Sequence, residues 1–414
     1  MITAPFDFSY LERGVWRSEN FWVSNFNFED EVVREYQFPE RVIFHDVTLR
    51  DGEQTPGVVL RRDEKVKIAQ ALDEVGVNRI EAGMPIVSNE DLMAIKDIVS
   101  LGLKAEIYAF CRMRYEDIEA ALKSGVDRVI IEGPIGLPKI FYQQGWSPEQ
   151  VIEYAVNSVQ YAVDHGLRVR FFGVDSTRAD YAFMVYLFKR VEELGVDGLV
   201  VADTYGSLTP EASRYLFKRL RSELGKTLEL EFHGHNDFGL ATATSLAALS
   251  SGANVVHVSV NGLGERAGNT SLEEVALCLS LLYGVRHSIK LENLFELSRL
   301  VQNLTRVKVA TNKPVVGEMV FARESGLGVA GWMKYPLAAE PYIPTIVGNK
   351  DVILIGKKSG RHSIEWKLRH LNLEATEEEI KEILGRVKEA SEAKKGPLTD
   401  EEFIKIVNEV LASG

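Results

Sequence analysis

Residues 197–240, DGLVVADTYGSLTPEASRYLFKRLRSELGKTLELEFHGHNDFGL, contain the pattern that indicates the fold class. A short apolar run, DGLVVAD, comes first and a second one, LELEFH, lies near the end. Between them, Thr209-Pro210 opens a stretch of helical spacing, and Thr followed by Pro is typical of a helix N-terminus. Short strands rich in apolar residues are typical of parallel sheets, which are buried on both faces. The segment therefore predicts a strand–helix–strand unit.

The same unit repeats outward from this segment, beginning near residue 42. Eight apolar runs alternate with eight segments of helical spacing, several of which end in glycine. Such alternation gives either a doubly wound open sheet or a closed (β/α)8 barrel, and eight units within about 245 residues favour the barrel. The predicted strands are residues 42–46, 78–83, 104–110, 127–133, 167–175, 197–203, 228–233 and 254–260.

Four regions are expected along the chain. Residues 1–40 are aromatic and acidic without a clear period, which predicts an irregular N-terminal arm that covers a surface of this subunit or of a partner. Residues 41–287 form the predicted catalytic barrel. Residues 288–345 combine a helical extension with a linker rich in Gly and Pro, and residues 346–414 predict a small helical subdomain with solvated charged faces.

The composition is that of an ordinary globular protein, with 45% hydrophobic and 26% charged residues among 414. The net charge is −12, and the absence of a basic stripe with interleaved aromatic residues argues against a nucleic acid partner. Cys111 and Cys278 are too few for a disulfide framework or a cysteine-type zinc site, and they fit a reduced cytoplasmic setting. No signal peptide is expected, because the N-terminus carries acidic residues and no apolar run. No membrane span is expected, because no stretch of about 18 consecutive apolar residues occurs.

A histidine pair follows the strand predicted over residues 228–233. His233 and His235 are two residues apart, and side chains at i and i+2 of a strand point the same way, so both rings can bind one metal ion. An isolated pattern of this kind also occurs as two polar residues where a strand meets solvent. In a (β/α)8 barrel, however, the C-terminal ends of strands carry the active site, which favours the metal. Asp51, just past the first strand, can supply a carboxylate ligand.

Other polar residues are expected at the same rim, which consists of the C-terminal strand ends and the loops that follow them. One carboxylate and two imidazoles, completed by an amide or by waters, suit Zn, Mn, Co, Fe(II) or Mg. Such an ion polarises a keto oxygen, and neighbouring arginines bind carboxylates. The rim therefore predicts a 2-oxo acid beside one divalent metal ion. The other rim residues are Arg50, Gln54, Arg112, Arg114, Arg170, Asp203, Thr204, Glu265, Arg266 and Asn269, of which Arg50, Arg112, Arg170 and Thr204 are expected to contact the substrate.

Five motifs together resemble the isopropylmalate, homocitrate and citramalate synthase family, within the wider DRE-TIM metallolyases. They are HDVTLRDGEQTPGV, EAGMP, FHGHNDFGLA, NGLGERAGNTSLEEV and GKKSGRHS, and the resemblance runs from about residue 41 to about residue 368. It implies condensation of acetyl-CoA with the ketone of a 2-oxo acid, driven by thioester hydrolysis. It also implies a homodimer in which the linker of one subunit reaches over the barrel of the other.

The resemblance assigns roles to particular residues. It implies a metal ion bound by Asp51, His233, His235 and, less directly, Asn269. It implies that Arg50 stabilises a developing enolate or alkoxide, and that Gln54 and Thr204 line the substrate pocket.

Two stretches depart from the family pattern. In the linker the family has ESGIHxDG, whereas residues 324–331 are ESGLGVAG, so Gly328 replaces a His and Ala330 an Asp. On the fifth strand the family carries an acid in a pattern like SAED, where this chain has Val174, and Phe172 replaces a small residue and should narrow the pocket. A general base needs a titratable group, which Gly, Ala and Val lack.

Two explanations of these departures stay open. Another group can supply the base, with Asp175, Tyr335, Tyr342 or His257 as candidates, although a histidine inside a strand is more often a core residue. Alternatively, the chain performs other metal-enolate chemistry or uses a different acyl donor. We expect an acyl-CoA:2-oxo-acid acyltransferase, with a metal-dependent lyase or aldolase, or a catalytically impaired keto-acid-binding paralogue, as alternatives.

Overall fold

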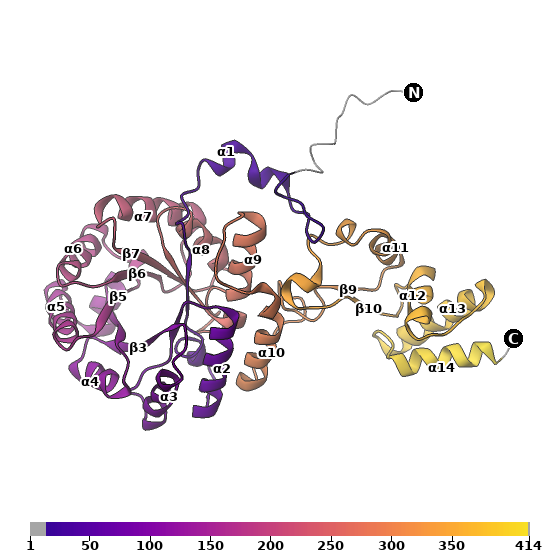
Figure 1. Ribbon diagram of the computed structural model, residues 1–414, viewed down its shortest axis with the longest axis horizontal. Helices are drawn as coiled ribbons and strands as arrows, with labels where there is room; N and C mark the ends of the chain where they lie inside the picture. Colours follow the sequence, from indigo (N-terminus) through magenta and orange to yellow (C-terminus); the bar gives the residue numbers. More distant parts are fainter. Residues whose placement is uncertain (1–13, 413–414) are drawn as a thin grey trace. The chain divides into compact units, whose positions relative to one another are not determined.

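The computed structural model describes residues 14–412 and contains a closed barrel of eight parallel strands (Figure 1). Each strand pairs with the next along the chain, and β8 pairs with β1 from Ile43↔Val255 to Asp46↔Val258, which closes the sheet. The predicted (β/α)8 fold is confirmed. The strands are β1 (Ile43–Asp46), β2 (Arg79–Glu81), β3 (Glu106–Arg112), β4 (Arg128–Pro134), β5 (Arg168–Val174), β6 (Gly198–Asp203), β7 (Glu229–Gly234) and β8 (Val255–Val258).

A helix follows each strand and covers the outside of the barrel (Figure 1). Ser147 and Thr209 cap two of these helices, because each side chain accepts a hydrogen bond from a backbone N–H in the first turn. Gly76 and Gly125 end two others in the left-handed conformation that glycine adopts without strain. The helices are α2 (Arg62–Val75), α3 (Asn89–Ser100), α4 (Tyr115–Ser124), α5 (Pro148–Asp164), α6 (Tyr181–Glu192), α7 (Pro210–Glu223), α8 (Ala241–Leu249) and α9 (Leu272–Leu282).

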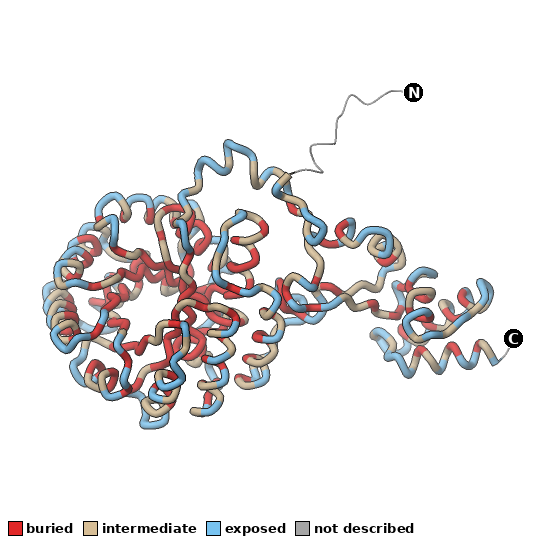
Figure 2. The backbone as a smooth tube through the Cα atoms, viewed as in Figure 1, coloured by how far each residue is buried: buried red, intermediate tan, exposed pale blue. Residues whose placement is uncertain are grey.

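Buried residues line the strands and the inner faces of the helices (Figure 2). Inside the barrel, an apolar cluster lies on β3 to β6 and includes Phe110, Ile130 and Phe172. Phe172 packs edge-on against Phe110, with ring centres 5.6 Å apart, so its ring fills part of the barrel interior.

The described chain divides into two compact units. The barrel unit spans residues 26–309 and includes α1 (Asp30–Val33) and α10 (Leu294–Thr305). Residues 26–40, the later part of the predicted arm, belong to this unit, where Tyr36 and Phe38 each pack against Tyr283 with ring centres 5.2 Å apart. These aromatic contacts hold residues 26–40 on the barrel unit, and α10 contacts α2 in the same unit.

The second unit contains residues 310–412 together with residues 14–25. Thr376 and Thr399 cap α13 and α14 through reciprocal hydrogen bonds with a glutamate three residues on. Ile364, Ile383 and Phe403, each from a different helix, form its core. Its elements are α11 (Gly326–Lys334), α12 (Arg361–His370), α13 (Glu377–Lys394), α14 (Asp400–Leu411) and a parallel pair of short strands, β9 (Ala322–Arg323) and β10 (Val352–Ile353).

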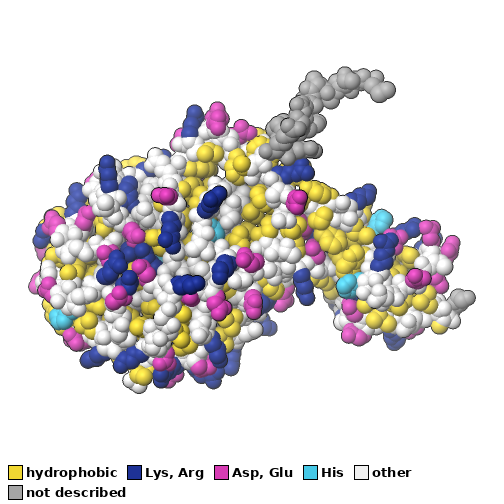
Figure 3. Space-filling view, in the orientation of Figure 1, with side chains coloured by type: hydrophobic (Ala, Val, Ile, Leu, Met, Phe, Trp, Pro, Cys, Tyr) yellow, Lys and Arg dark blue, Asp and Glu magenta, His cyan; other side chains and the backbone are white. Residues whose placement is uncertain are grey.

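Basic and acidic side chains are interspersed over the visible face (Figure 3). Within the described part of the chain, no helix has both the length and the apolar content that crossing a membrane requires.

Candidate metal centre and active site

Asp51, His233 and His235 converge at the C-terminal end of the barrel. His233 belongs to β7, His235 follows it, and Asp51 lies in the turn after β1. The Nε2 atoms of the two histidines are 3.2 Å apart, and each lies 3.8 Å from Asp51 Oδ2. Ligand atoms that share an ion at about 2.0–2.2 Å lie roughly 3–4 Å from one another. The three buried side chains therefore fit one divalent ion.

These side chains also have the protonation states that metal ligation needs. Burial lowers the pKa of His233 well below its ordinary value and lowers the pKa of His235 as well. Burial by itself would raise the pKa of Asp51, but the Arg50 guanidinium and His235 hold it below its ordinary value. Neutral imidazoles and an ionised carboxylate can bind a cation without first releasing protons.

Asn269 lies beside Asp51 and His235. Its Nδ2 atom donates to Asp51 Oδ1 and to the Leu263 carbonyl, both at 2.9 Å, and its backbone forms a bridge with His235. Its Oδ1 atom is buried and accepts no hydrogen bond from any described residue. A buried acceptor without a partner is costly, and a cation beside it would satisfy it. Asn269 thus orients Asp51 and has an amide oxygen free for a ligand.

Arg50 is fixed beside this set by two carboxylates. Its Nε atom donates to Glu81 Oε2 at 2.5 Å and its Nη1 atom to Asp51 Oδ2 at 2.7 Å. Its guanidinium carbon lies 4.0 Å from the centre of the Phe110 ring. The buried Nη2 atom donates to no described residue, so it is available for an anionic oxygen. Sequence reasoning missed Glu81, although the predicted strand NRIEAG carries an acid near its C-terminal end.

A cavity of about 140 Å³ opens at the ends of β3, β4 and β5. Arg112, which the sequence placed after the third strand, is the last residue of β3 and donates to Asp117 through Nε and Nη2 at 2.8 and 2.9 Å. Glu132 and Val174 reach the cavity from β4 and β5. The remaining lining residues are Met113, Arg114, Pro134, Lys139, Gln143, Gln144 and Trp146.

Gln54 and Thr204 also lie at the rim. Gln54 is exposed at the end of a 3-10 turn, Gly52–Gln54, that directly follows Asp51. Thr204 follows β6, and its Oγ1 atom accepts a hydrogen bond of 2.8 Å from the Asp175 backbone N–H. Both residues stay candidates for substrate contacts.

Asp175 is buried and lies in the left-handed conformation, with φ of 63°. Its two carboxylate oxygens accept from Nε and Nη2 of Arg178 at 2.8 and 2.7 Å. A bidentate pair of this kind is strong and occupies both oxygens. These contacts argue against the predicted role of Asp175 as a base.

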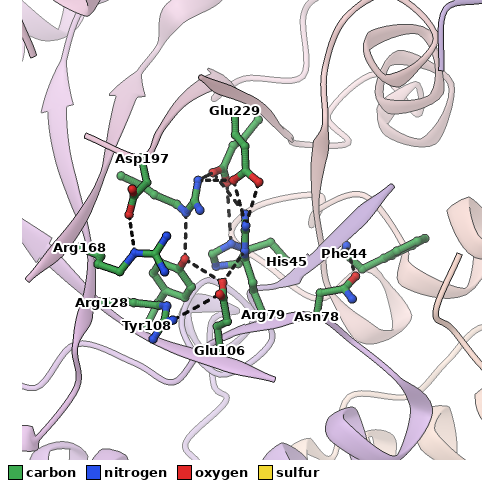
Figure 4. A network of polar contacts seen from close by, with 12 residues as sticks. Phe44, His45, Asn78, Arg79, Glu106, Tyr108, Arg128, Arg168, Asp197 and Glu229 are labelled. Carbon is green, nitrogen blue, oxygen red and sulfur yellow. Dashed lines mark hydrogen bonds and ion pairs between the residues drawn. The ribbon is translucent and has the colours of Figure 1, made fainter. Parts of the chain in front are cut away.

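The prediction that Arg170 lies at the rim is wrong. Arg170 is the third residue of β5 and is 2% exposed. Its Nη1 atom lies 2.5 Å from Glu231 and 2.7 Å from Glu229, and its Nε atom donates to the Tyr108 hydroxyl at 3.0 Å. Figure 4 shows Arg79, Glu106, Tyr108 and Glu229 in the same network. Because barrel side chains fill the interior in layers, an inward-pointing residue early in a strand lies well below the rim.

His257, another candidate base, belongs to the same interior network. Its Nε2 atom lies 2.9 Å from Glu231, and its ring stacks on His45 with centres 4.4 Å apart. His45, Glu231 and His257 lie close enough together to share an ion. Arg170 and Arg79 already provide two positive charges beside Glu231, which disfavours a cation there. His257 is therefore best described as a core residue.

The tyrosines considered as bases, Tyr335 and Tyr342, belong to the second unit. Tyr335 accepts a hydrogen bond from Arg17 and packs edge-on against Trp22, and Tyr342 packs against Phe321.

The chain matches a family model described as HMGL-like over residues 41–301 and one described as homocitrate synthase post-HMGL domain-like over residues 315–395. It is 40% identical to "Homocitrate synthase AksA" of Methanothermobacter thermautotrophicus over 94% of this chain and 98% of the relative. It is 43% identical to "(R)-citramalate synthase CimA" of Methanocaldococcus jannaschii, over 88% of this chain and 74% of the relative. A "2-isopropylmalate synthase" of the same organism is 41% identical over 92% and 75%.

Solved structures share the barrel. A hydroxymethylglutaryl-CoA lyase from Pseudomonas aeruginosa superposes with a TM-score of 0.59 at 23% identity, over 66% of this chain and 95% of that one. An HMG-CoA lyase from Bacillus subtilis gives 0.58 at 20% identity, over 66% and 96%. At these identities the likeness concerns the fold.

Proposed function

This chain belongs to the HMGL-like family, as its motifs predicted, and we propose that it is an acyltransferase that condenses an acyl-CoA with a 2-oxo acid. The substrates are acetyl-CoA, or a close homologue, and a 2-oxo acid, and the product is an alkylmalate or homocitrate-like hydroxy acid. The convergence of Asp51, His233 and His235 beside Arg50 carries the proposal. The printed names of the similar synthases support the reaction class.

The residues that would hold one divalent ion are Asp51, His233 and His235, with the amide oxygen of Asn269 as a further candidate. When bound, the ion acts as a Lewis acid on the keto oxygen. Mg, Mn, Zn and Co all suit a mixed N/O ligand set.

Arg50 stabilises the negative charge that develops on the keto oxygen. Its free Nη2 atom can donate to that oxygen, while Glu81 and Asp51 fix the plane of the guanidinium. A donor that is already oriented stabilises a developing charge without reorganisation during the reaction. Burial at the site also keeps water away and strengthens this interaction.

Gln54, Thr204 and Arg112 contact the substrates in this proposal. Gln54 is exposed one turn after Asp51, and Thr204 follows the end of β6. Arg112 lines the cavity at the ends of β3 to β5, where Arg114 and Lys139 add positive charge for an anionic group.

The enzyme is further proposed to be a cytoplasmic homodimer. In the second unit, Leu327 is 90% exposed, and Met333 and Tyr335 on or beside the same helix are also exposed. Several exposed apolar side chains on or next to one short helix favour a protein partner. Cys111 and Cys278 are free thiols, as expected in a reducing compartment. Light scattering coupled to size exclusion tests the dimer directly.

A thiol-release assay tests the proposed reaction. Acetyl-CoA is offered with pyruvate, 2-oxoisovalerate, 2-oxoglutarate or oxaloacetate, with and without Mg²⁺, Mn²⁺, Zn²⁺ or Co²⁺. We expect CoA release with one of these acids that depends on the metal and is lost in Asp51→Ala. Metal binding without CoA release from any of them would sink the proposal and favour a lyase, which an assay of hydroxy-acid cleavage would reveal.

A further inference from the structure

At the C-terminal end of β5, next to β4, the chain lacks the acidic residue that the family pattern has there. Val174, the last residue of β5, occupies that position and lines the cavity at the ends of β3 to β5. Gly328 removes a second titratable group from the pattern. Condensation at the α-carbon of a thioester needs a group that accepts a proton, so the chain must supply one elsewhere.

Glu132 brings a carboxylate to the same cavity from the neighbouring strand. In the β4–β5 ladder, Glu132 pairs with Phe172 and Pro134 pairs with Val174. Ile130 belongs to the apolar cluster inside the barrel, and alternate residues of a strand face the same side, so Glu132 also faces inward. Glu132 and Val174 line the same cavity. Because Glu132 pairs with Phe172, two residues before Val174, it lies one inward-facing position further from the rim than Val174 does.

Glu132 differs from the other interior carboxylates in the described part of the chain, because it has neither a hydrogen bond nor an ion pair. A carboxylate that is not already engaged can accept a proton without first breaking another contact. The engaged carboxylates at the strand ends are Asp51 with Arg50 and Asn269, Glu81 with Arg50, Asp175 with Arg178, and Asp203 with Thr177, Ser207 and Leu208.

The charges around Glu132 are suitable for a general base that removes a proton from carbon. Burial raises the pKa of Glu132 above its ordinary value, whereas Arg50, Lys139 and Arg112 each act to lower it and Asp117 acts to raise it. A higher pKa makes the carboxylate a better proton acceptor, and nearby cations stabilise the anion formed on the substrate.

On the premise of the proposed condensation, we propose that Glu132 is the catalytic base that removes a proton from the α-carbon of the acyl-CoA thioester. The C–H bond breaks, the proton passes to a carboxylate oxygen of Glu132, and the electron pair forms the enolate. The enolate carbon then bonds to the keto carbon, and the carbonyl π pair moves to the keto oxygen, which takes up a proton from solvent. Water hydrolyses the thioester and releases the CoA thiol, and Glu132 returns its proton to solvent.

If Glu132 took part in substrate binding rather than in proton transfer, its substitution would change KM rather than kcat. A carboxylate in the cavity could repel 2-oxo acids that carry a second negative charge, and it would then control KM rather than the proton transfer. Loss of an interaction made only in the transition state lowers kcat, whereas loss of a binding interaction changes KM. The two roles are therefore separable by kinetics.

The test uses the metal-loaded full chain, with acetyl-CoA, [²H₃]acetyl-CoA and the 2-oxo acid that wild type turns over. For Glu132→Gln, kcat should fall by about 10²- to 10⁴-fold, while KM for the 2-oxo acid changes by less than about threefold. The deuterium isotope effect on kcat should rise above that of wild type, because proton removal becomes the slow step. Glu132→Asp should retain part of the activity, and adding Val174→Glu to Glu132→Gln should restore part of it, since a carboxylate returns to the cavity.

Melting temperature and metal content show whether each variant is folded. Glu153 is exposed on α5, so Glu153→Gln is the matched control and should behave as wild type. A Glu132→Gln enzyme with kcat within about threefold of wild type, or with a change in KM alone, would overturn the assignment of Glu132 and leave the proposed reaction standing. Absence of CoA release from wild type with every 2-oxo acid would overturn the reaction and the assignment together.

Discussion

Arg50 and Glu81 form a buried ion pair at the top of the barrel, with Arg50 Nε 2.5 Å from Glu81 Oε2. Glu81 comes from β2 and Arg50 from the turn after β1, so two adjacent strand ends determine where the guanidinium lies. The same guanidinium donates to Asp51. The pair thus connects the residue proposed to stabilise charge on the keto oxygen with the residues proposed to hold the metal.

Replacing Glu81 tests this connection. In Glu81→Gln, Arg50 keeps Asp51 but loses one of its two charged partners in a buried setting, and breaking a buried pair costs up to about 3–5 kcal/mol of unfolding free energy. We expect kcat to fall more than KM rises, because the guanidinium is no longer oriented before the reaction. Steady-state kinetics and urea unfolding check this. An enzyme with unchanged kcat would show that Arg50 does not need Glu81.

Replacing Arg170 tests its placement in the core. In Arg170→Leu, Glu231 and Glu229 lose a close cation, and we expect a loss of about 3–5 kcal/mol of unfolding free energy. KM for the 2-oxo acid should stay unchanged in the folded fraction. Arg168→Leu is a matched control on the same strand, because the Arg168 side chain is 51% exposed in its pair with Asp197 and should cost at most about 1 kcal/mol. A rise in KM for the 2-oxo acid with no change in unfolding free energy would show that Arg170 contacts the substrate.

Metal binding should stabilise the folded chain. A ligand at 100 times its Kd adds about 2.7 kcal/mol to the unfolding free energy, provided that it binds only the folded state. We expect the melting temperature to rise with added divalent metal and to fall with a chelator. Asp51→Asn should lose most of this response, whereas Asp63→Asn, exposed on α2, should keep it. If the melting temperature of Asp51→Asn rose with metal as much as that of wild type, Asp51 would not be a metal ligand.

Asp46 should make stability depend on pH. Burial, with Glu81 and Glu273 nearby, raises the pKa of Asp46 to about 7 although Thr48 donates two hydrogen bonds to it. A carboxyl group whose pKa is higher in the folded state stabilises that state fully below its unfolded pKa, and the contribution is lost as the pH rises through the folded pKa. Between pH 4 and pH 7, wild type should therefore lose stability relative to Asp46→Asn. Urea unfolding of both proteins at several pH values measures the difference, and a constant difference would contradict the prediction.

The barrel could be predicted from the sequence, because apolar strands, helix caps and terminal glycines act locally and recur along the chain. The second unit's helices were also predictable, since Thr376 and Thr399 each precede a helical pattern by one residue. Metal candidates followed from the same reasoning: Asp51 and His233 come after or near the ends of predicted strands, and all strand ends of a parallel barrel meet at one rim.

The contacts of each polar residue at the rim could not be predicted from the sequence, because they depend on how the strands pack. Arg170 was misplaced because the sequence does not reveal how far along a strand the rim begins, and a buried carboxylate such as Glu231 can hold an arginine well below it. Glu81 and Glu132 lie near the ends of two similar predicted strands, NRIEAG and DRVIIEG, yet Glu81 is paired with Arg50 whereas Glu132 has no hydrogen-bond or ion-pair partner among the described residues. Pairing depends on which side chains adjacent strands bring to the same layer, and register between strands is a property of the closed barrel rather than of any one segment.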